Sequence, residues 1–252
     1  MSPLFHRRAP DSPVVEPVPT VFPKIEGAEI AAVFSGKRIG GDFYDSLRVS
    51  PERVLFGMLD LAGRREDNLG ILTAAQEIFR SFGTELFSKQ DINESDAMTQ
   101  LSLRINRHII EASHGVHSCP AFLACYHEKF GTLCYTNAGH TPGLLRDSRG
   151  ISQLASTGLP LGLFSHATAE APTVGLEKGA VALLVSRGVV ECGEQSRFGE
   201  EFGIDHVRAF LLGAKITSAE ALCASVLNSA TQFGSGNAFC NDLTAMALVR
   251  TI

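Results

Sequence analysis

The chain has 252 residues, of which 44% are hydrophobic, and its formal net charge is -5 at pH 7. This length suits one large domain or two small ones, and the acidic balance leaves no electrostatic footprint for nucleic acid or an anionic membrane. The longest apolar run, residues 179–185, is far too short to cross a bilayer, and residues 1–8 lack the apolar core of a secretion signal. Six cysteines without CxxC spacing predict reduced thiols in a cytoplasmic protein.

The N-terminal residues 1–24 are rich in proline. Prolines recur every few residues from Pro3 to Pro23, and helical periodicity is absent. Because proline fixes φ and removes a backbone donor, such a stretch stays extended. We therefore predict a flexible tail over residues 1–24, which links, tethers or docks at one edge, and a single domain over residues 25–252.

Short strands and a few helices follow the tail. We predict strands at residues 29–34, 53–60, 121–128, 132–137, 143–146, 180–186 and 243–250. Apolar residues at three- and four-residue steps predict helices at 68–87, at 95–113 with Ser95 and Asp96 as the start signal, and at 218–231. We expect residues 64–67 in a solvated loop and residues 150–177 in a connection poor in strands. Helices grouped between runs of strands indicate an α+β fold.

Two segments place carboxylates beside glycines, each close to a predicted strand. Residues 40–45 read GGDFYD and residues 60–63 read DLAG. Magnesium and manganese prefer hard oxygen ligands, and glycines let the backbone approach an ion closely. Two such ions about 3.5–4 Å apart can share an aspartate, activate a water and clamp a phosphoryl group. Taken alone, each segment also fits an ordinary turn.

Four motifs in order resemble the metal-dependent PPM-type protein serine/threonine phosphatases, in the bacterial SpoIIE/RsbU branch. Residues 40–45 carry that branch's GGDFYD signature unchanged, and residues 60–63 are similar to its Asp-Val-Ser-Gly, although the following His-Gly is here Arg64-Arg65. Residues 136–142 (TNAGHTP) and 158–162 (GLPLG) match two further family segments, and the agreement runs from about residue 25 to 250. The resemblance implies a β-sandwich of two mainly antiparallel sheets flanked by helices.

The resemblance also implies roles for individual positions. Asp42 would be a ligand or water-holder of one metal ion, and Asp60 would bridge two ions. The backbone carbonyl of Leu61 would complete the shell of the ion that Asp42 serves. Residues that support these motifs are Gly40, Gly41, Asp45, Gly63 and Gly188.

Two departures from the family pattern fall on the second ion. Active members supply it with the aspartate of a Thr-Asp-Gly segment and with the first aspartate of an Asp-Asp-x-Thr segment, and these positions are here Arg187 and Asn241. Arginine stays protonated and cannot become a ligand. At about 4 Å and an effective dielectric near 20, two unit charges repel by about 4 kcal/mol, and a divalent ion would feel about twice that. We predict that Arg187 excludes the second ion and pairs with Asp60 in its place.

Milder outcomes remain open at both positions. The amide oxygen of Asn241 can coordinate a hard ion, and Asp242 stands next to it as a substitute ligand. Arg187 can instead point to solvent, which would leave a weak site. The sequence therefore assigns no catalytic residue with certainty, and it allows one or two Mn²⁺ or Mg²⁺ ions in a competent site and none in a disabled one.

Two functions from different classes fit these residues. The first is a non-catalytic or impaired phosphatase domain that binds a phosphorylated regulatory partner, for which the resemblance implies an anti-anti-sigma-like protein. The alternative is an active Mn²⁺- or Mg²⁺-dependent protein serine/threonine phosphatase that dephosphorylates such a partner. Loss of two ligands of one ion favours the first. We expect neither nucleic acid nor a membrane as a partner, and a homodimer is compatible with the sequence.

Overall fold

The computed structural model describes residues 16–36, 41–61, 63–113, 117–166, 169–194, 200–233, 238–239 and 242–252, with residues 194, 238 and 239 described by their backbone alone. Residues 1–15 of the predicted tail lie outside these ranges. Two residues singled out by the sequence, Gly40 and Asn241, also lie outside them.

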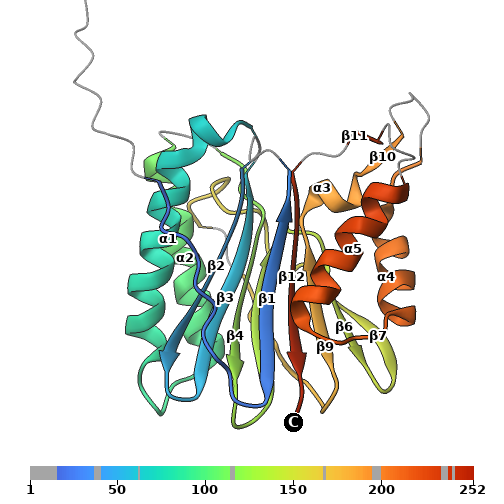
Figure 1. Ribbon diagram of the computed structural model, residues 1–252. Coiled ribbons are helices and arrows are strands. Elements are labelled where there is room, and N and C mark those ends of the chain that lie inside the picture. The colour runs from blue at the N-terminus through green and yellow to red at the C-terminus, as the bar shows by residue number, and fades with distance from the viewer. Residues whose placement is uncertain are drawn as a thin grey trace, which may run out of the picture.

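Two five-stranded antiparallel sheets form the centre of the molecule (Figure 1). The first has the order β2-β3-β4-β5-β8, with bounds Gly41–Ser50, Arg53–Leu61, Ala121–His127, Thr132–Ala138 and Thr173–Gly175. The second has the order β1-β12-β9-β6-β7, with bounds Ala28–Ser35, Leu243–Arg250, Val181–Val185, Gly143–Asp147 and Gly150–Leu154. A short ribbon pairs β10 (Gly193–Glu194) with β11 (Ala238–Phe239).

Helices cover the outer face of each sheet, so the molecule has four layers (Figure 1). The first sheet carries α1 (Arg65–Phe87) and α2 (Glu94–Ala112). The second carries α4 (Gly203–Gly213) and α5 (Ala219–Phe233), and the four-residue α3 (Arg187–Val190) follows β9. This arrangement confirms the predicted α+β sandwich of antiparallel sheets flanked by helices. In the part of the chain that the structure describes, no helix has the length and apolar character that a bilayer span requires.

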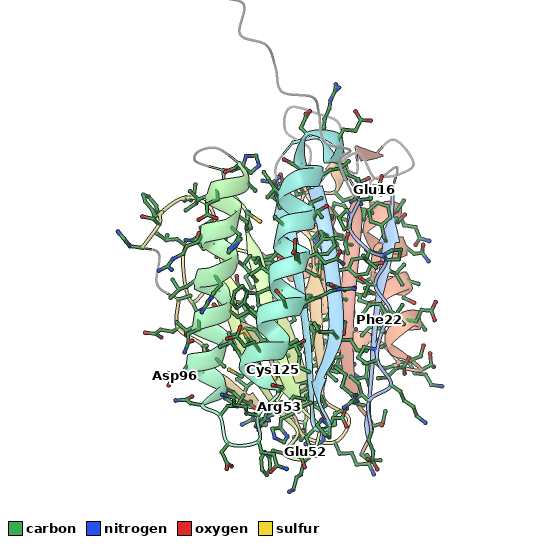
Figure 2. All side chains as sticks on the ribbon, turned by 90° about the vertical axis from the view of Figure 1, so that its left-hand side faces the viewer. Glu16, Phe22, Glu52, Arg53, Asp96 and Cys125 are labelled. Carbon is green, nitrogen blue, oxygen red and sulfur yellow. The ribbon has the colours of Figure 1, made fainter. Side chains whose placement is uncertain are left out.

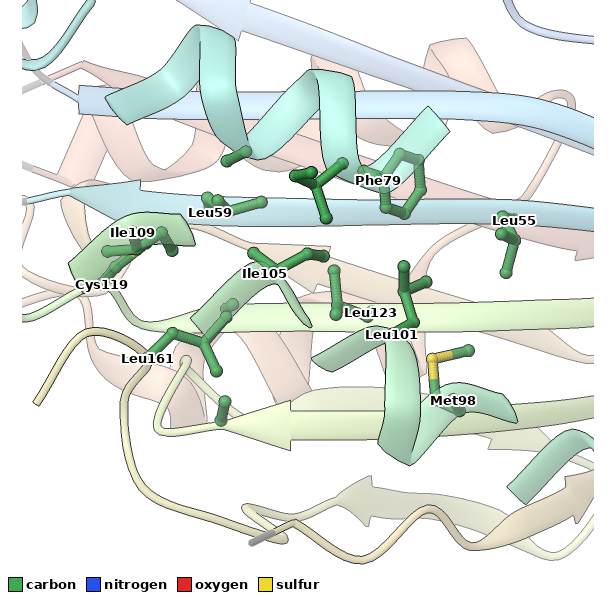
Figure 3. Close-up of a cluster of buried hydrophobic side chains, with 14 of the residues drawn as sticks. Leu55, Leu59, Phe79, Met98, Leu101, Ile105, Ile109, Cys119, Leu123 and Leu161 are labelled. Carbon is green, nitrogen blue, oxygen red and sulfur yellow. The ribbon is translucent and has the colours of Figure 1, made fainter. Parts of the chain in front are cut away.

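Three apolar clusters separate these layers. One lies between the two sheets and includes Phe56, Phe122 and Leu184. The second lies between α4, α5 and the second sheet. The third lies between α1, α2 and the first sheet, where Figure 3 shows Leu101 and Ile105 among the side chains of the strands. The predicted helical periodicity therefore corresponds to real buried faces.

Several sequence-based boundaries need correction. The expected loop at residues 64–67 is wrong from Arg65 onwards, because the acidic residues there form the first turn of α1, where negative charge is favourable. Helix α2 is capped by Asn93, whose side chain accepts hydrogen bonds from the backbone amides of Ser95 and Asp96, so Ser95 is not the start signal. The stretch 150–177 contains β7 and β8, and α4 was not anticipated.

The cysteines are mostly as expected. The four described as free thiols, Cys119, Cys125, Cys134 and Cys223, are all buried. Cys192 is disulfide-bonded, so the prediction that all six cysteines are reduced thiols is wrong at this position.

Candidate metal centre at one end of the sandwich

The predicted carboxylates meet where both sheets end, near the top of Figure 1. Strands β2 and β12 begin there, and β3 and β9 end there. Asp42 and Asp60 are register partners in the antiparallel β2–β3 pair, so their side chains project from the same face of the sheet. They flank the layer between the sheets, because their neighbours Tyr44 and Met58 belong to that apolar cluster.

The second sheet holds Asp42 by a direct hydrogen bond. The hydroxyl of Thr244, on β12, donates to Oδ2 of Asp42 at 2.8 Å. The Thr244 backbone amide in turn donates to Oγ of Ser186, and the Ser186 amide donates to the Thr244 carbonyl. Ser186 and Thr244 are both buried, so this small network fixes the end of β9 against the start of β12. Asp42 therefore links the two sheets.

The two aspartates oppose each other electrostatically. Burial, and next the negative charge of Asp60, raise the pKa of Asp42 to about 7, although the hydrogen bond from Thr244 acts in the opposite direction. Asp60 is 6% exposed, and its backbone amide donates to the carbonyl of Pro120. A partly buried and a buried carboxylate side by side are a suitable place for a divalent cation.

The backbone beside this pair leaves room for an ion. A Cβ at Gly41 would lie 2.3 Å from the carbonyl oxygen of Leu61, so any larger residue would fill the space beside that oxygen. Gly63 has φ +102°, a conformation that other residues rarely adopt, at the turn between β3 and α1. The donor set of Asp42, Asp60 and the Leu61 carbonyl is composed of hard oxygens and fits one Mg²⁺ or Mn²⁺ ion.

Arg187 lies against Asp60, as expected from the charge change. Its backbone amide donates to Oδ2 of Asp60 at 3.2 Å, and its Nη2 lies 3.9 Å from Oδ1. The guanidinium also faces Glu191 at 3.6 Å, and the Arg187 side chain is 52% exposed. The ion pair with Asp60 is therefore present but long, and it is shared with a second carboxylate. Gly188, the next residue, is buried within α3.

Asp242 is a further carboxylate near this end. It is 8% exposed, and its charge contributes to the raised pKa of Asp42. Among the residues that the structure describes, however, no three His, Cys, Asp or Glu side chains come close enough together to hold a metal ion. The described carboxylates thus form a pair at Asp42 and Asp60, with Asp242 nearby.

Asp45 belongs to the same motif but serves a different purpose. It lies three residues after Asp42 on a strand, so its side chain points to the opposite face, toward α1. There it accepts two hydrogen bonds from Arg80, one from Gln76 and one from Thr20. Asp45 is 1% exposed, and it fastens helix α1 and the N-terminal segment to β2.

The other two family segments support the end of β9. Asn137 accepts from the His140 amide, and the Thr141 hydroxyl donates to the carbonyl of Val185, next to Ser186. Gly139 has φ +72°, and a Cβ there would lie 2.5 Å from Pro160 of the second segment. These motifs therefore brace the residues before Arg187.

A cleft of about 270 Å³ opens beside Asp42. Its described lining comes from β1 and β2, from Asp242, from Arg65 at the start of α1, and from residues 16–20. Sequence reasoning missed the contributions of Arg65 and of residues 16–20, because nothing in a proline-rich stretch indicates where it docks. It also missed Thr244, although its place in the degenerate Asp-Asp-x-Thr segment was a usable signal.

Comparison with known proteins shows the family. Residues 50–251 match the model of the family described as Stage II sporulation protein E (SpoIIE). The chain belongs to the SpoIIE family. The members of this family are PPM-type protein serine/threonine phosphatases.

Three similar proteins illustrate the range of the family. Phosphoserine phosphatase RsbU of Bacillus subtilis is 26% identical over 184 residues, which cover 72% of this chain and 52% of RsbU. The solved RsbU and RsbW domains of Rv1364c from Mycobacterium tuberculosis are 18% identical with a TM-score of 0.74, over 91% of this chain and 62% of that one. RsbX in complex with magnesium is 13% identical with a TM-score of 0.63, over 90% of this chain and 97% of that one. The chain spans 32% to 52% of the length of the curated relatives it matches.

Proposed function

We propose that this chain is a SpoIIE-family phosphatase domain with an impaired or inactive catalytic centre, and that it acts by binding a phosphorylated regulatory protein. The observation that carries the proposal is the position of Arg187, whose amide and guanidinium both face Asp60. Asp60 is the residue that two ions would have to share.

One ion fits the residues that remain. Asp42, Asp60 and the Leu61 carbonyl would hold it, and the raised pKa of Asp42 is the expected property of a carboxylate that lacks a neighbouring cation. A bound Mg²⁺ or Mn²⁺ ion would supply Lewis acidity and lower the pKa of a water. Residues of this chain orient the pair: Thr244 fixes Asp42, and the Pro120 carbonyl and Arg187 amide fix Asp60.

A second ion is opposed by charge. With the guanidinium of Arg187 3.9 Å from Asp60, a divalent ion sharing Asp60 would approach a permanent positive charge. At an effective dielectric near 20, this repulsion amounts to several kcal/mol, about 4 kcal/mol per pair of unit charges at 4 Å. Because Arg187 is half exposed, solvent screens part of that repulsion. The binding site of the second ion would therefore be weakened rather than abolished.

The proposed partner is a phosphorylated protein of the anti-anti-sigma type. Support comes from the resemblance to RsbU-like phosphatases and from the retained fold around the cleft, which leaves the surface beside Asp42 in place. We propose that the chain recognises this partner and regulates it by binding.

An active Mn²⁺- or Mg²⁺-dependent phosphatase is the alternative. It is favoured by the intact register pair of Asp42 and Asp60 and by the buried Asp242, which stands beside the altered position 241. In that case Asp242 or the amide of Asn241 would replace the missing aspartate, and Arg187 would move away from Asp60.

Phosphatase activity separates the two functions. The assay uses Mn²⁺ with a phosphoserine peptide and with a chromogenic phosphate ester. It compares the wild-type chain, Asp60→Asn, and the double reversion Arg187→Asp with Asn241→Asp. We expect no turnover by the wild type and measurable turnover by the double reversion, because the fold and the proposed ligands Asp42, Asp60 and Leu61 are retained. Wild-type turnover that disappears in Asp60→Asn would overturn the proposal and establish the active enzyme.

Binding is measured separately. We expect the wild-type chain to bind the phosphoserine peptide more tightly than the same peptide without phosphate, by isothermal titration calorimetry. Equal affinity for the two peptides would contradict the proposed role in binding a phosphorylated partner.

A further inference from the structure

The described N-terminal residues run along the edge of the candidate centre. We call residues 16–24 the N-terminal strap. The Val18 amide donates to Oε1 of Gln76, and Nε2 of Gln76 donates back to the Val18 carbonyl, at 2.7 and 2.8 Å. The Thr20 hydroxyl donates to the Tyr44 carbonyl, and the ring of Phe22 stacks on Tyr44. Figure 2 labels Glu16 and Phe22 along this course.

The N-terminal strap places the carboxylate of Glu16 near the guanidinium of Arg65, which lines the cleft. Among the described residues that line the cleft beside Asp42, Arg65 is the one positively charged side chain, and the other charged ones are Glu16, Asp42 and Asp242. Nη2 of Arg65 lies 3.9 Å from Oε2 of Glu16. The Arg65 side chain is 16% exposed, whereas the Glu16 side chain is 70% exposed.

This ion pair is suited to exchange. At 3.9 Å the two groups attract without a hydrogen bond, and an exposed carboxylate is easily replaced by another anion. The guanidinium of arginine offers parallel N–H donors that match a phosphate as well as a carboxylate. A phosphate also carries more charge than a carboxylate, so it gains more from the same cation.

We propose that Arg65 binds the phosphate group of the protein ligand, in the position that the carboxylate of Glu16 takes in the free chain. This inference rests on the proposed function, because it names the residue that recognises the phosphate. The family motif that residues 60–63 resemble continues with His-Gly, and Arg65 stands at the position of that glycine. The strap would then act as a built-in competitor for the ligand.

Titration with inorganic phosphate tests the role of Arg65 directly. Phosphate is added to the full chain in the presence of Mg²⁺, with chloride at equal ionic strength as the reference, and binding is followed by NMR of the backbone amides. We expect Arg65→Gln to weaken phosphate binding by about tenfold or more, since charge-assisted hydrogen bonds are lost. Arg65→Lys keeps the charge but lacks the parallel N–H donors of arginine. Its phosphate affinity should therefore lie between that of the wild type and that of Arg65→Gln.

Two further variants complete the test. Arg64→Gln is the matched control, because Arg64 is an exposed neighbour that does not line the cleft, and it should change phosphate affinity by less than about twofold. Glu16→Gln removes the competing carboxylate and should strengthen phosphate binding by about two- to fivefold. Far-UV circular dichroism of each variant verifies the fold.

The outcomes separate this inference from the proposed function. Equal effects of Arg65→Gln and Arg64→Gln, or no saturable phosphate binding by the wild type, would overturn the role of Arg65. If the chain prefers the phosphorylated peptide and Arg65→Gln leaves that preference intact, the proposed function stands and this inference fails. If inorganic phosphate binds through Arg65 but the two peptides bind equally, Arg65 is a phosphate site, but recognition of a phosphorylated protein, and with it the proposed function, fails.

Discussion

The two sheets contribute unequally to the candidate metal centre. The first sheet supplies Asp42, Asp60 and the Leu61 carbonyl, the three oxygen donors that we propose for one ion. The second sheet supplies the Thr244 hydroxyl and the Ser186 network, but it presents Arg187 where the motif resemblance implies a carboxylate. The difference teaches that each half is placed mainly by the backbone of its own sheet, with the Thr244–Asp42 hydrogen bond as the link between the halves. One half can therefore lose its ligands without disturbing the other.

If each half is anchored separately, the largest stability loss should come from the anchor of the first sheet. We expect Asp45→Ala to lower the free energy of unfolding by about 3 kcal/mol, because Arg80, Gln76 and Thr20 lose a buried shared acceptor. Urea unfolding measures the change. Asp91→Ala, at an exposed loop position, is the matched control and should stay within about 0.5 kcal/mol. Equal losses in the two variants would contradict the anchoring role.

The raised pKa of Asp42, in the half of the centre that the first sheet supplies, predicts that the stability of the metal-free protein depends on pH. Since the folded pKa of Asp42 is about 7 and the ordinary pKa of an aspartate is 3.8, the folded state binds more protons between these values, and stability falls as pH rises through them. With chelator present, Asp42→Asn should abolish this fall and exceed the wild type in stability above pH 7 by up to about 4 kcal/mol.

Thermal unfolding over this pH range is the measurement for Asp42, with Asp91→Asn as the control variant. A wild type whose stability is flat or rises between pH 4 and 7, relative to Asp42→Asn, would show that Asp42 is not strained. Added Mn²⁺ should reverse the wild-type trend, because the ion stabilises the charged form.

The link between the halves should have a smaller effect. Thr244→Val removes the hydroxyl that donates to Asp42 at 2.8 Å, and we expect a loss of about 1–2 kcal/mol above pH 7. The pKa of Asp42 should rise further, because the Thr244 hydrogen bond lowers it. Carboxyl carbon NMR follows that pKa. Thr231→Val, whose hydroxyl bonds within its own helix, is the control, and an unchanged Asp42 pKa in Thr244→Val would refute the link.

The smallest change in stability is expected at Arg187, in the half of the centre that the second sheet supplies. Arg187→Gln should shift the unfolding free energy by less than about 1 kcal/mol, since the ion pair with Asp60 is long and the side chain is half exposed. Chemical denaturation of Arg187→Gln, with Arg64→Gln as the control, measures this change in unfolding free energy. A loss of several kcal/mol would mean that Arg187 holds the fold together, and that its charge does not primarily concern the metal site.

The sequence predicted the fold well where apolar periodicity was strong. The strand at residues 243–250 was predicted with the observed ends, and α1, α2 and α5 were found because each buries one face. Strand β2 was missed because its polar residues serve both faces: Asp42 points into the end of the sandwich, whereas Asp45 points to α1. Strands β7 and β8 are short and partly exposed, so they lack a clear pattern.

The candidate site was only partly legible. Asp42, Asp60 and Arg187 were singled out from motifs, and the structure brings them together. Arg65 and Glu16 come together because the N-terminal strap docks on α1 and β2. The strap is held by hydrogen bonds of Val18 to Gln76 and of Thr20 to Asp45, and each joins segments that are distant in the sequence. No local pattern encodes such contacts, since they arise only when α1 and β2 are packed.

Metal stoichiometry tests the central claim most directly. The number of Mn²⁺ ions per chain is determined by native mass spectrometry and calorimetry for the wild type and for the double reversion Arg187→Asp with Asn241→Asp. The wild type should bind no more than one ion, and the reversion should bind two. Two ions bound by the wild type with similar affinity would contradict the claim that the second sheet's half of the centre is lost.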